Sequence, residues 1–556
     1  MSRVLNRVLS VLISVSIWVS LSGTAKAEQG MLAEIQRQPD MSRRFMVSET
    51  LRLKDQKEKV LSVIYGNADY GFFESRRMHE KVHSIEFKFV PPGYLKPIQI
   101  FLKVDHGGDT RLIFVKSNTY ESPVKNLFSG RFKTKGRFSS GFFLFNFWIR
   151  DKILNKLIGP LLTIVNSNGE VVWILTNSEL TLDGDPYRQI WYAAQSSDRS
   201  AFHVLYHGQK SYYQSINIFG DSQRRTDFNP SDCPNHDFVL EPGSDELVFL
   251  DFKRKHVFGA TVLTDSAPSV WKTISRGILS YAFPLVYQAS YIQELNLATG
   301  VVRELWDPFY FFSPKHDFNR ELGSGEDVFL HPLKVFDYLK MYYNLRNPGS
   351  CFASDNRRHV DWMHANSIRH VLGKGYLISI RNFDKIIFVD ERFKKIIWSL
   401  GPEESDTYHF ESQEDVFSSQ HDASINSRGN LLVFDNHGPS RGIVETKGPS
   451  RIVEIKLDFT TKKARVVWSF SPKNLFSEKK GSVSELPGGN VLGFFPVSGT
   501  KDLNRTGTED RLFEVNPRTG KVVGEMSIGA EVEGGYRAVP VNSLSEDVFI
   551  GKTLPL

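Results

Sequence analysis

Three histidines each begin a short stretch of sequence that has the pattern of a β-hairpin. The stretches start at His236, His364 and His421, and a fourth copy starts at Gly481. Each copy contains a short strand, a turn with glycine and a second apolar strand. If the copies are structurally equivalent, the histidines occupy equivalent places, and such places in a radially repeated fold lie on a ring. We therefore expect the three imidazoles to converge on a common axis.

Three imidazoles that meet at one point can perform two kinds of chemistry. They can bind a metal ion that keeps one open coordination position. They can instead act without a metal, with one ring as a nucleophile and the others as acids, bases or charge stabilisers in group transfer. Packing alone gives no reason to desolvate three imidazoles around one axis, so the repeated register indicates a functional site. Single histidines elsewhere we interpret as surface or core residues, namely His203, His207, His370, His409 and His437.

Two arginines near the histidines favour chemistry without a metal. Arg381 ends the strand that pairs with the His364 strand, and Arg537 follows Tyr536 at the same register of the last repeat. Guanidinium groups would repel a metal cation, whereas they bind the oxygens of a sulfuryl or phosphoryl group through directional hydrogen bonds. Asn366 lies two residues after His364 and therefore points to the same face of its strand, where it adds a neutral donor.

A second hairpin alternates with the histidine hairpin, so that each repeat contains four strands. Its copies, several of which end in tryptophan, lie at 161–173, 291–306, 386–398, 452–468 and 512–523. Six repeats begin near Tyr187, His236, His364, His421, Ser482 and Tyr536. Because their spacing suits propeller blades with loop insertions, we predict an all-β fold with a six-bladed β-propeller over residues 156–556.

The longest interval between repeats, from His236 to His364, indicates an insertion. Within it, residues 308–358 include Pro332 followed by apolar residues at helical spacing, which is the pattern of a helix that begins with proline. We therefore predict a helical insertion. Its place directly before His364 would put it above the channel as a lid or a wall.

The first 155 residues do not show the repeat. Residues 1–27 have a basic start, an apolar run and the small-residue pattern Ala25-Lys26-Ala27, which together are typical of a signal peptide. We expect export, with an uncleaved N-terminal membrane anchor as the alternative. Residues 28–155 we interpret as a small β-rich domain with helical decoration, because 31–37 and 48–63 have helical spacing and later segments resemble strands.

Residues 131–149 combine basic residues with a run of aromatic ones. Such a segment can dock on an anionic membrane surface. It can also be an apolar strand that follows a solvated basic loop, and we favour this second interpretation.

Composition narrows the classes of partner. The formal net charge of +6 (69 basic minus 63 acidic side chains) is small for 556 residues. It gives weak support to anionic small substrates and does not suit nucleic-acid binding, which needs a concentrated basic face. The only two cysteines, Cys233 and Cys351, each precede a histidine hairpin. They could pair in an oxidising compartment or remain buried thiols.

Motifs at the histidine hairpins resemble, in the same order, the successive motifs of bacterial arylsulfate sulfotransferases. They are Asp361-Trp-Met-His-Ala-Asn-Ser-Ile368, Leu377-Ile-Ser-Ile-Arg381, Ser418-Ser-Gln-His-Asp-Ala423, Leu432-Val-Phe-Asp-Asn436, Ser450-Arg-Ile-Val-Glu454 and Tyr536-Arg-Ala538. The resemblance extends over roughly residues 158–545. It implies a periplasmic six-bladed propeller that moves a sulfuryl group from an aryl sulfate to a phenol, independently of a nucleotide donor and without a cofactor.

The resemblance also implies roles for individual residues. His421 matches the nucleophile that is transiently sulfurylated, and ping-pong kinetics should follow. His364 and Arg381 match residues that hold the sulfuryl oxygens, and His236 matches a histidine suited to proton transfer with the phenol. Asn366, Tyr536 and Arg537 complete the predicted site as substrate-binding residues. A homodimer is a further expectation.

The chain departs from the family pattern in one respect, since residues 402–419 lack the cysteine pair that precedes the nucleophile in other members. Two alternatives to sulfotransfer stay open at this point. One is a metal-dependent propeller hydrolase or lactonase that uses the same histidines. The other is a propeller without catalysis that acts as a binding module. The natural donor and acceptor are not determined by the sequence.

Overall fold

The structure is a computed structural model of the 556-residue chain. It describes residues 32–38, 47–53, 59–68, 71–75, 84–89, 97–119, 130–151, 156–175, 189–197, 199, 201–207, 211–217, 222–229, 231–257, 285–313, 321–322, 360–438, 448–497, 509–529, 532–533, 535–541, 548–551 and 554. The predicted signal peptide, Tyr187, Pro332 and Cys351 lie outside these ranges. No helix in these ranges is both long enough and apolar enough to cross a membrane.

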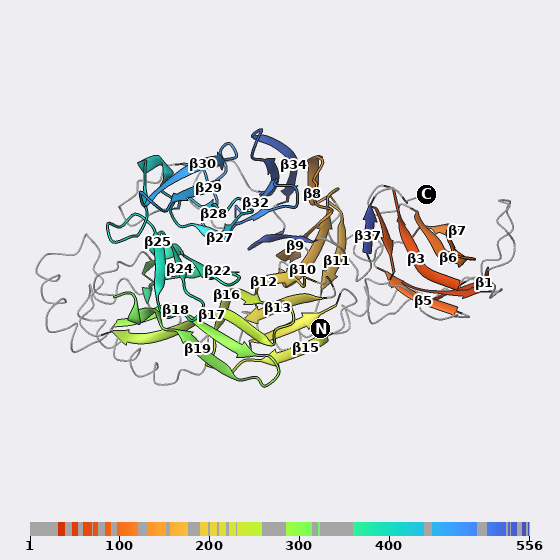
Figure 1. Cartoon of the computed structure of the whole chain (residues 1–556), viewed down its shortest axis with the longest axis horizontal. Coiled ribbons are helices and arrows are strands. Elements are labelled where there is room, and N and C mark those ends of the chain that lie inside the picture. The colour runs from red at the N-terminus through yellow and green to blue at the C-terminus, as the bar shows by residue number, and fades with distance from the viewer. Residues whose placement is uncertain are drawn as a thin grey trace, which may run out of the picture.

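Six antiparallel sheets form a ring, and we number them as blades in chain order (Figure 1). Blade 1 contains β9 (Phe142–Asp151), β10 (Lys156–Asn166) and β11 (Val171–Leu175), with β35 (Val532–Glu533) and β36 (Ala538–Val541) paired to β9. Blade 2 contains β12 (Gln189–Gln195), β13 (Phe202–His207), β14 (Tyr212–Ile216) and β15 (Ser222–Asp227). Blade 3 contains β16 (Pro234–Leu240), β17 (Glu246–Val257), β18 (Leu285–Asn296) and β19 (Val302–Trp306), and the short β20 (Glu321–Leu322) and β21 (Val360–Asp361) extend it.

The other three blades follow the same four-strand plan. Blade 4 contains β22 (Ala365–Val371), β23 (Gly375–Ile380), β24 (Lys385–Val389) and β25 (Ile396–Leu400). Blade 5 contains β27 (His421–Ile425), β28 (Leu431–Asp435), β29 (Arg451–Asp458) and β30 (Lys463–Phe470), with β26 (His409–Phe410) at its edge. Blade 6 contains β31 (Ser482–Glu485), β32 (Val491–Phe495), β33 (Asp510–Asn516) and β34 (Lys521–Ile528), with β8 (Phe132–Gly136) at its edge. Short 3₁₀ helices are η2 (Pro308–Tyr310), η5 (Arg381–Phe383) and η6 (Gln413–Asp415).

The innermost strands close the ring. They contact one another in the order β36, β12, β16, β22, β27 and β31, and β31 contacts β36 again. The all-β fold and the six-bladed propeller that the repeats predict are therefore confirmed. The predicted helix after Pro332 lies outside the described residues.

Strands from both ends of the chain complete the ring (Figure 1). β36, near the carboxyl end, pairs with β9 in blade 1, and β8 pairs with the outer strand β34 of blade 6. Because β9 and β10 share one sheet, the propeller includes residues that precede the predicted boundary at 155. These pairings cover the inner edge of β9 and the outer edge of β34.

Two further sheets lie beside the propeller, on the right in Figure 1. One has the order β1 (Leu32–Gln38), β2 (Val47–Leu53) and β5 (Ser84–Phe89). The other has the order β37 (Val548–Gly551), β4 (Gly71–Glu74), β3 (Lys59–Asn67), β6 (Ile98–His106) and β7 (Asp109–Asn118), so the last strand of the chain returns to the N-terminal sheet.

The expectation of helices over 31–37 and 48–63 was wrong. β1, β2 and β3 occupy these stretches, and β3 pairs along its length with β6. β3 is rich in β-branched and aromatic residues and is buried on nearly every position, so sheet pairing and burial outweigh the helical spacing.

The aromatic part of residues 131–149 belongs to the core. Phe143, Phe145 and Phe147 of β9 are fully buried and pack with residues of blade 6, including Phe494 and Met526. Burial at this site explains the aromatic run without a membrane surface. Lys133 and Lys135 of β8 are exposed, as a solvated basic segment should be.

Candidate active site

The three predicted histidines lie at the same end of three successive inner strands. His236 is in β16 of blade 3, His364 directly precedes β22 of blade 4, and His421 begins β27 of blade 5. These strands lie next to one another in the ring. The alternation of hairpins in the sequence therefore brings residues that are far apart in the chain to one end of the channel.

A repeated hydrogen bond fixes the approach to each histidine. In all three blades, a backbone group three residues before the histidine is bound to an Asp or Asn side chain on the second strand or just after it. The bonds are Cys233 N–H to Asp251 Oδ1 (2.5 Å), Asn382 Nδ2–H to the Asp361 carbonyl (2.7 Å) and Ser418 N–H to Asp435 Oδ1 (3.0 Å). The three histidines are therefore equivalent in structure as well as in sequence, because a side chain on or just after the second strand of each blade holds the backbone that precedes the histidine.

The backbone is bulged where each histidine lies. The pairing register shifts between Asn235 and Phe238 in blade 3, between Ala365 and Ser367 in blade 4, and between His421 and Ser424 in blade 5. A bulge of this kind changes the direction of a side chain at the rim of a sheet. His236 (φ 55°) and His364 (φ 53°) are also in the left-handed region, which non-glycine residues adopt only when the surrounding structure holds them there.

The three histidines form one cluster with Tyr536. The ring centroids of His236 and His364 are 4.8 Å apart. Tyr536 stacks on His236, with the ring centroids 5.4 Å apart, and makes a T-shaped contact with His421, with the centroids 6.2 Å apart. The prediction that the imidazoles converge is therefore what the structure shows, with a tyrosine between two of them.

Asn436 and the Ser419 carbonyl, which lies 3.0 Å from Nδ1, set the tautomer of His421. The Asn436 side-chain NH₂ group donates to the carbonyls of Ser477 and Lys480, at 2.8 Å each. Its Oδ1 atom, 2.7 Å from His421 Nδ1, can therefore only accept, so the proton of the neutral ring is on Nδ1. Nε2 then carries the lone pair, and it accepts a hydrogen bond from the Lys480 N–H at 3.2 Å.

Two of the histidines are held in the neutral form. His421 is 2% exposed, and burial together with the positive charge of Arg381 holds its pKa well below the ordinary value. His236 is 3% exposed, and burial together with the neighbouring His364, His421 and Arg537 lowers its pKa in the same direction. A neutral imidazole keeps a lone pair, which a nucleophile or a general base needs.

His364 has a different environment. Its Nδ1 atom is hydrogen-bonded to the Asp361 carboxylate, and its side chain is 22% exposed, more than those of the other two histidines. Because a carboxylate only accepts, Nδ1 carries a proton and Nε2 is the nitrogen left for a ligand.

Arg381 lies in η5 directly after β23 and is 3% exposed. Its backbone N–H donates to the His364 carbonyl at 3.2 Å, and its guanidinium donates to Asn382 Oδ1 at 3.0 Å. The charge of Arg381 acts on His421, which places a cation beside the ring that has the lone pair.

Asn366 and Arg537, predicted to bind substrate, both make protein contacts. The Asn366 NH₂ group donates to the Gln420 carbonyl at 2.7 Å, directly before His421. Arg537 donates to the Asn366 carbonyl and pairs with Asp237 and Asp422 at 3.1 and 3.6 Å. These contacts hold the backbone near the histidines.

Three residues near the cluster were missed as site residues from the sequence. Asn436 and Asp361 stand inside motifs that resemble the sulfotransferase family, but only the folded chain shows that they orient His421 and His364. His207, which we interpreted as structural, is 5% exposed at the end of β13 and close enough for its charge to lower the pKa of His236. A lone histidine in a strand gives no sequence signal of this proximity.

Comparison with known proteins agrees with the site. Residues 285–537 match the arylsulfotransferase (ASST) family model. The matched region includes His364, Arg381, His421 and Tyr536, and it begins after His236. The resemblance inferred from the motifs is therefore confirmed for the arylsulfotransferase region. It supports aryl sulfotransfer as the general activity, with aryl sulfates and phenols as the substrate classes.

Other comparisons add little to the arylsulfotransferase match. No curated protein matches the chain. Similar solved structures include a protein of unknown function from Bacteroides caccae (11% identity, TM-score 0.34, 73% of this chain and 100% of that chain). They also include the periplasmic gluconolactonase PpgL of Pseudomonas aeruginosa (11%, 0.31, 87% and 100%) and the β-propeller domain of Cps50 (Swd1) from Myceliophteria thermophila (12%, 0.32, 70% and 87%). At these TM-scores we draw no conclusion from them.

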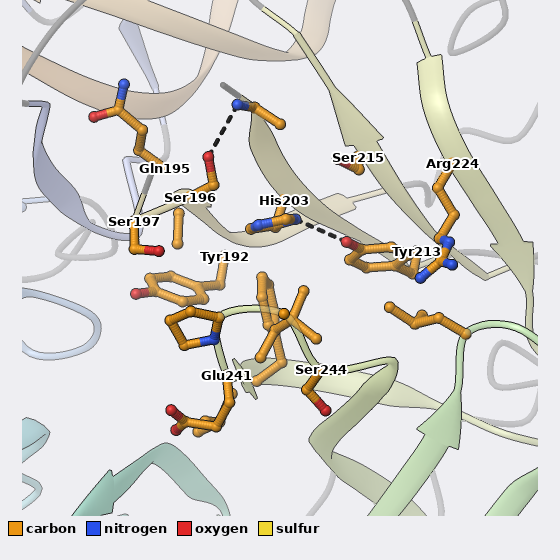
Figure 2. Close-up of a pocket in the computed structure, with 18 of the residues that line it drawn as sticks. Tyr192, Gln195, Ser196, Ser197, His203, Tyr213, Ser215, Arg224, Glu241 and Ser244 are labelled. Atoms are coloured by element: carbon orange, nitrogen blue, oxygen red, sulfur yellow. Dashed lines mark hydrogen bonds between the residues drawn. The ribbon is translucent and has the colours of Figure 1, made fainter. Parts of the chain in front are cut away.

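A cavity of about 760 Å³ lies at the other end of the inner strands (Figure 2). Its lining includes Ser196, which follows β12, and Glu241, which follows β16, whereas the histidines lie at the starts of their strands. Figure 2 shows His203 in this lining, with its Nδ1 atom 2.7 Å from the hydroxyl of Tyr213. Among the residues described, His236, His364 and His421 do not line this cavity, so it is separate from the histidine cluster.

Proposed function

We propose that this protein transfers a sulfuryl group from an aryl sulfate to a phenol through a sulfohistidine on His421. The observation that carries the proposal is the pair His421 and Asn436. A neutral, buried imidazole with its Nδ1 proton bound to an amide oxygen offers Nε2 as a nucleophile. The same ring lies in a cluster with two other histidines and beside a guanidinium.

In the first half-reaction, His421 Nε2 attacks the sulfur atom. The N–S bond forms as the S–O bond to the aryl group breaks, and the electron pair of that bond leaves on the phenolate. The hydrogen bond from the Lys480 N–H to Nε2 must be given up for this attack, because both use the same lone pair. The Nδ1 proton stays on the ring and remains bound to Asn436.

In the second half-reaction, the phenol oxygen attacks the sulfur of the intermediate. The S–O bond forms, the N–S bond breaks, and its electron pair returns to Nε2. The phenol proton needs a neutral acceptor, and the lowered pKa of His236 keeps that ring neutral and able to take it. Donor and acceptor use the same site in turn, which predicts ping-pong kinetics.

Arg381 and His364 are suited to hold the three sulfuryl oxygens. Negative charge on these oxygens is best stabilised by donors that are already oriented before reaction. Arg381 is fixed through its backbone and through Asn382, and His364 is fixed by Asp361. Arg381 therefore provides N–H groups, and His364 an oriented Nε2 atom, whose directions do not have to be organised during the reaction.

The arrangement does not favour the metal-dependent alternative. Within the described ranges, no group of three His, Cys, Asp or Glu side chains has the geometry to hold a metal ion.

Incubation with 4-nitrophenyl sulfate tests the proposal. We expect a burst of nitrophenolate without phenol, sustained turnover when phenol is added, and a mass increment of one sulfuryl group on the peptide that contains His421. His421→Asn should lose both the burst and the increment, while His409→Asn, in the edge strand β26, should keep them. Nitrophenolate release that is unchanged in His421→Asn would exclude this nucleophile.

We also propose that the protein is exported to the periplasm. Residues 1–27 have the pattern of a signal peptide, and Cys233 is disulfide-bonded in a chain whose only other cysteine is Cys351. Disulfides persist in oxidising compartments. N-terminal sequencing of the protein from the periplasmic fraction should give Glu28 as the first residue, whereas an intact N-terminus in the membrane fraction would indicate an uncleaved anchor. Sedimentation of the same sample tests the expected homodimer.

A further inference from the structure

Three buried charged residues and one partly exposed arginine form a network next to the histidine cluster. We call Asp237, Arg369, Asp422 and Arg537 the arginine–aspartate network. Arg537 Nη1 is 3.1 Å from Asp237 Oδ2 and 3.6 Å from Asp422 Oδ1. Arg369 pairs with the same two carboxylates, at 2.5 Å to Asp422 Oδ1. Two positive and two negative groups balance, as buried charges must.

Each carboxylate of the network directly follows a histidine of the site. Asp237 follows His236, Asp422 follows His421, and Arg537 follows Tyr536. Asp237, Asp422 and Arg537 are 0%, 3% and 2% exposed. One peptide unit therefore joins each of Asp237, Asp422 and Arg537 to a ring of the cluster.

The network joins all six blades. Asp237 of blade 3 accepts the Ile368 N–H of blade 4 at 3.0 Å, and Asp422 of blade 5 accepts the Val483 N–H of blade 6 at 3.0 Å. Arg537, which leads into β36 of blade 1, donates to the Asn366 carbonyl of blade 4. The ring of Tyr192 in blade 2 lies 4.9 Å from the Arg537 guanidinium and 5.4 Å from that of Arg369.

A network of this kind is a poor means of stabilising a fold. Burying ion pairs costs desolvation, and apolar residues of similar size often stabilise a protein equally well. What the network does provide is directional contact at strained backbone: His236 (φ 55°) and Asp422 (φ 49°) are both left-handed. Reaction rates are sensitive to displacements of about 1 Å in reacting groups, so rigid placement here has a functional value.

We propose that Arg537 is a positioning residue, which sets the placement of His236 relative to His421 by binding the carboxylates that follow them, and that it does not bind the substrate. This inference rests on the proposed function and assigns Arg537 a role different from the substrate contact expected from the sequence. The guanidinium is already engaged by Asp237, Asp422 and the Asn366 carbonyl.

The two roles predict different kinetics for Arg537→Met. A positioning role lowers kcat, by about 100-fold for a displacement near 1 Å, and leaves KM for 4-nitrophenyl sulfate within about threefold. If Arg537 instead binds the substrate, Arg537→Met raises KM, and kcat measured at saturating donor stays near the wild-type value. Arg537→Lys restores a charge but not the forked geometry, so we expect it to recover part of kcat only.

A charge-balanced variant separates positioning from folding. Arg537→Met alone leaves a buried carboxylate without compensation and can unfold the protein, whereas Arg537→Met with Asp237→Asn removes one charge of each sign. We expect this double variant to recover the unfolding midpoint of the wild type but to keep a kcat at least about tenfold low. Arg428→Met, which breaks the pair with Glu454 in blade 5, is the matched control and should change the midpoint without changing kcat.

The outcomes distinguish the two proposals. If the wild-type protein gives no sulfuryl adduct on His421, the proposed function fails whatever the variants do. If the wild type forms the adduct but the double variant regains both stability and kcat, or if Arg537→Met changes KM alone, the positioning role of Arg537 is overturned.

Discussion

Asn436 and His421 fix each other's orientation. The amide of Asn436 donates to the carbonyls of Ser477 and Lys480, and its oxygen accepts the Nδ1 proton of His421 at 2.7 Å. The orientation of a neutral histidine is thereby determined by an uncharged partner. An uncharged partner leaves the pKa of the ring low, whereas a carboxylate at the same place would raise it.

Replacing Asn436 should slow the first half-reaction. Asn436→Ala removes the nearer of two acceptors for the Nδ1 proton and leaves the Ser419 carbonyl, 3.0 Å from Nδ1. The ring is then held less firmly, and the other tautomer, which has no lone pair on Nε2, becomes more populated. We expect the burst rate of nitrophenolate release to fall by about 100-fold, measured by stopped-flow absorbance. Asn430→Ala, in the turn after β27, is the control and should keep the wild-type rate. An unchanged burst in Asn436→Ala would show that Asn436 does not control the reactivity of His421.

The pH profile of the burst should report the lowered pKa of His421. Attack requires the neutral ring, and burial with Arg381 nearby keeps the ring neutral below its ordinary pKa of about 6.5. The acid limb of the burst rate should therefore lie below pH 6.5. Arg381→Gln removes the cation, so the acid limb should move to higher pH while the maximum rate falls. A limb that does not move would show that Arg381 does not act on His421.

Stability should depend on pH through the buried histidines. The folded-state pKa values of His236 and His421 are lowered, so below pH 6.5 the unfolded chain binds more protons than the folded one, and stability is lost as the pH falls. The slope is at most about 1.4 kcal/mol per pH unit for each histidine.

A buried carboxyl has the opposite effect on stability. Burial raises the pKa of Asp251 from 3.8 to about 7, so its contribution to stability is lost as the pH rises between these values. The test is therefore the difference in unfolding free energy between the wild type and His236→Gln, followed from pH 5 to pH 8 by urea titration. A difference that is independent of pH would contradict a neutral His236.

Removing the carboxylate beside His364 should affect turnover more than stability. Asp361→Asn keeps a hydrogen-bond acceptor for Nδ1 but removes the negative charge beside the ring. We expect kcat to fall by about tenfold. Both side chains are partly exposed, so the unfolding midpoint should change little. Equal losses in kcat from Asp361→Asn and from Asp390→Asn, in the turn after β24, would argue for a nonspecific effect.

The blades and the convergence of the histidines could be predicted because both depend on local patterns. A hairpin is recognisable within about 20 residues, and a repeat of hairpins implies a ring. His236, His364 and His421 hold equivalent positions in that repeat. This equivalence alone predicts that their side chains lie close together.

Long-range pairing could not be predicted in the same way. Nothing near β3 indicates that it pairs with β6, and nothing near Arg537 points to Asp237, which is 300 residues earlier (537 minus 237). The left-handed backbone at His236 and His364 is equally unpredictable, because those residues prefer other conformations when the surrounding sheet does not constrain them.

The ring is completed by the inner strand that is made last. Tyr536, Arg537 and β36 all come after the other five inner strands in the chain, and β36 joins a sheet whose β9 was made among the first. During vectorial synthesis or translocation, any nascent chain that stops before Tyr536 lacks part of the cluster and all of β36. The cluster around His421 therefore cannot be complete until Tyr536, Arg537 and β36 have been synthesised or translocated.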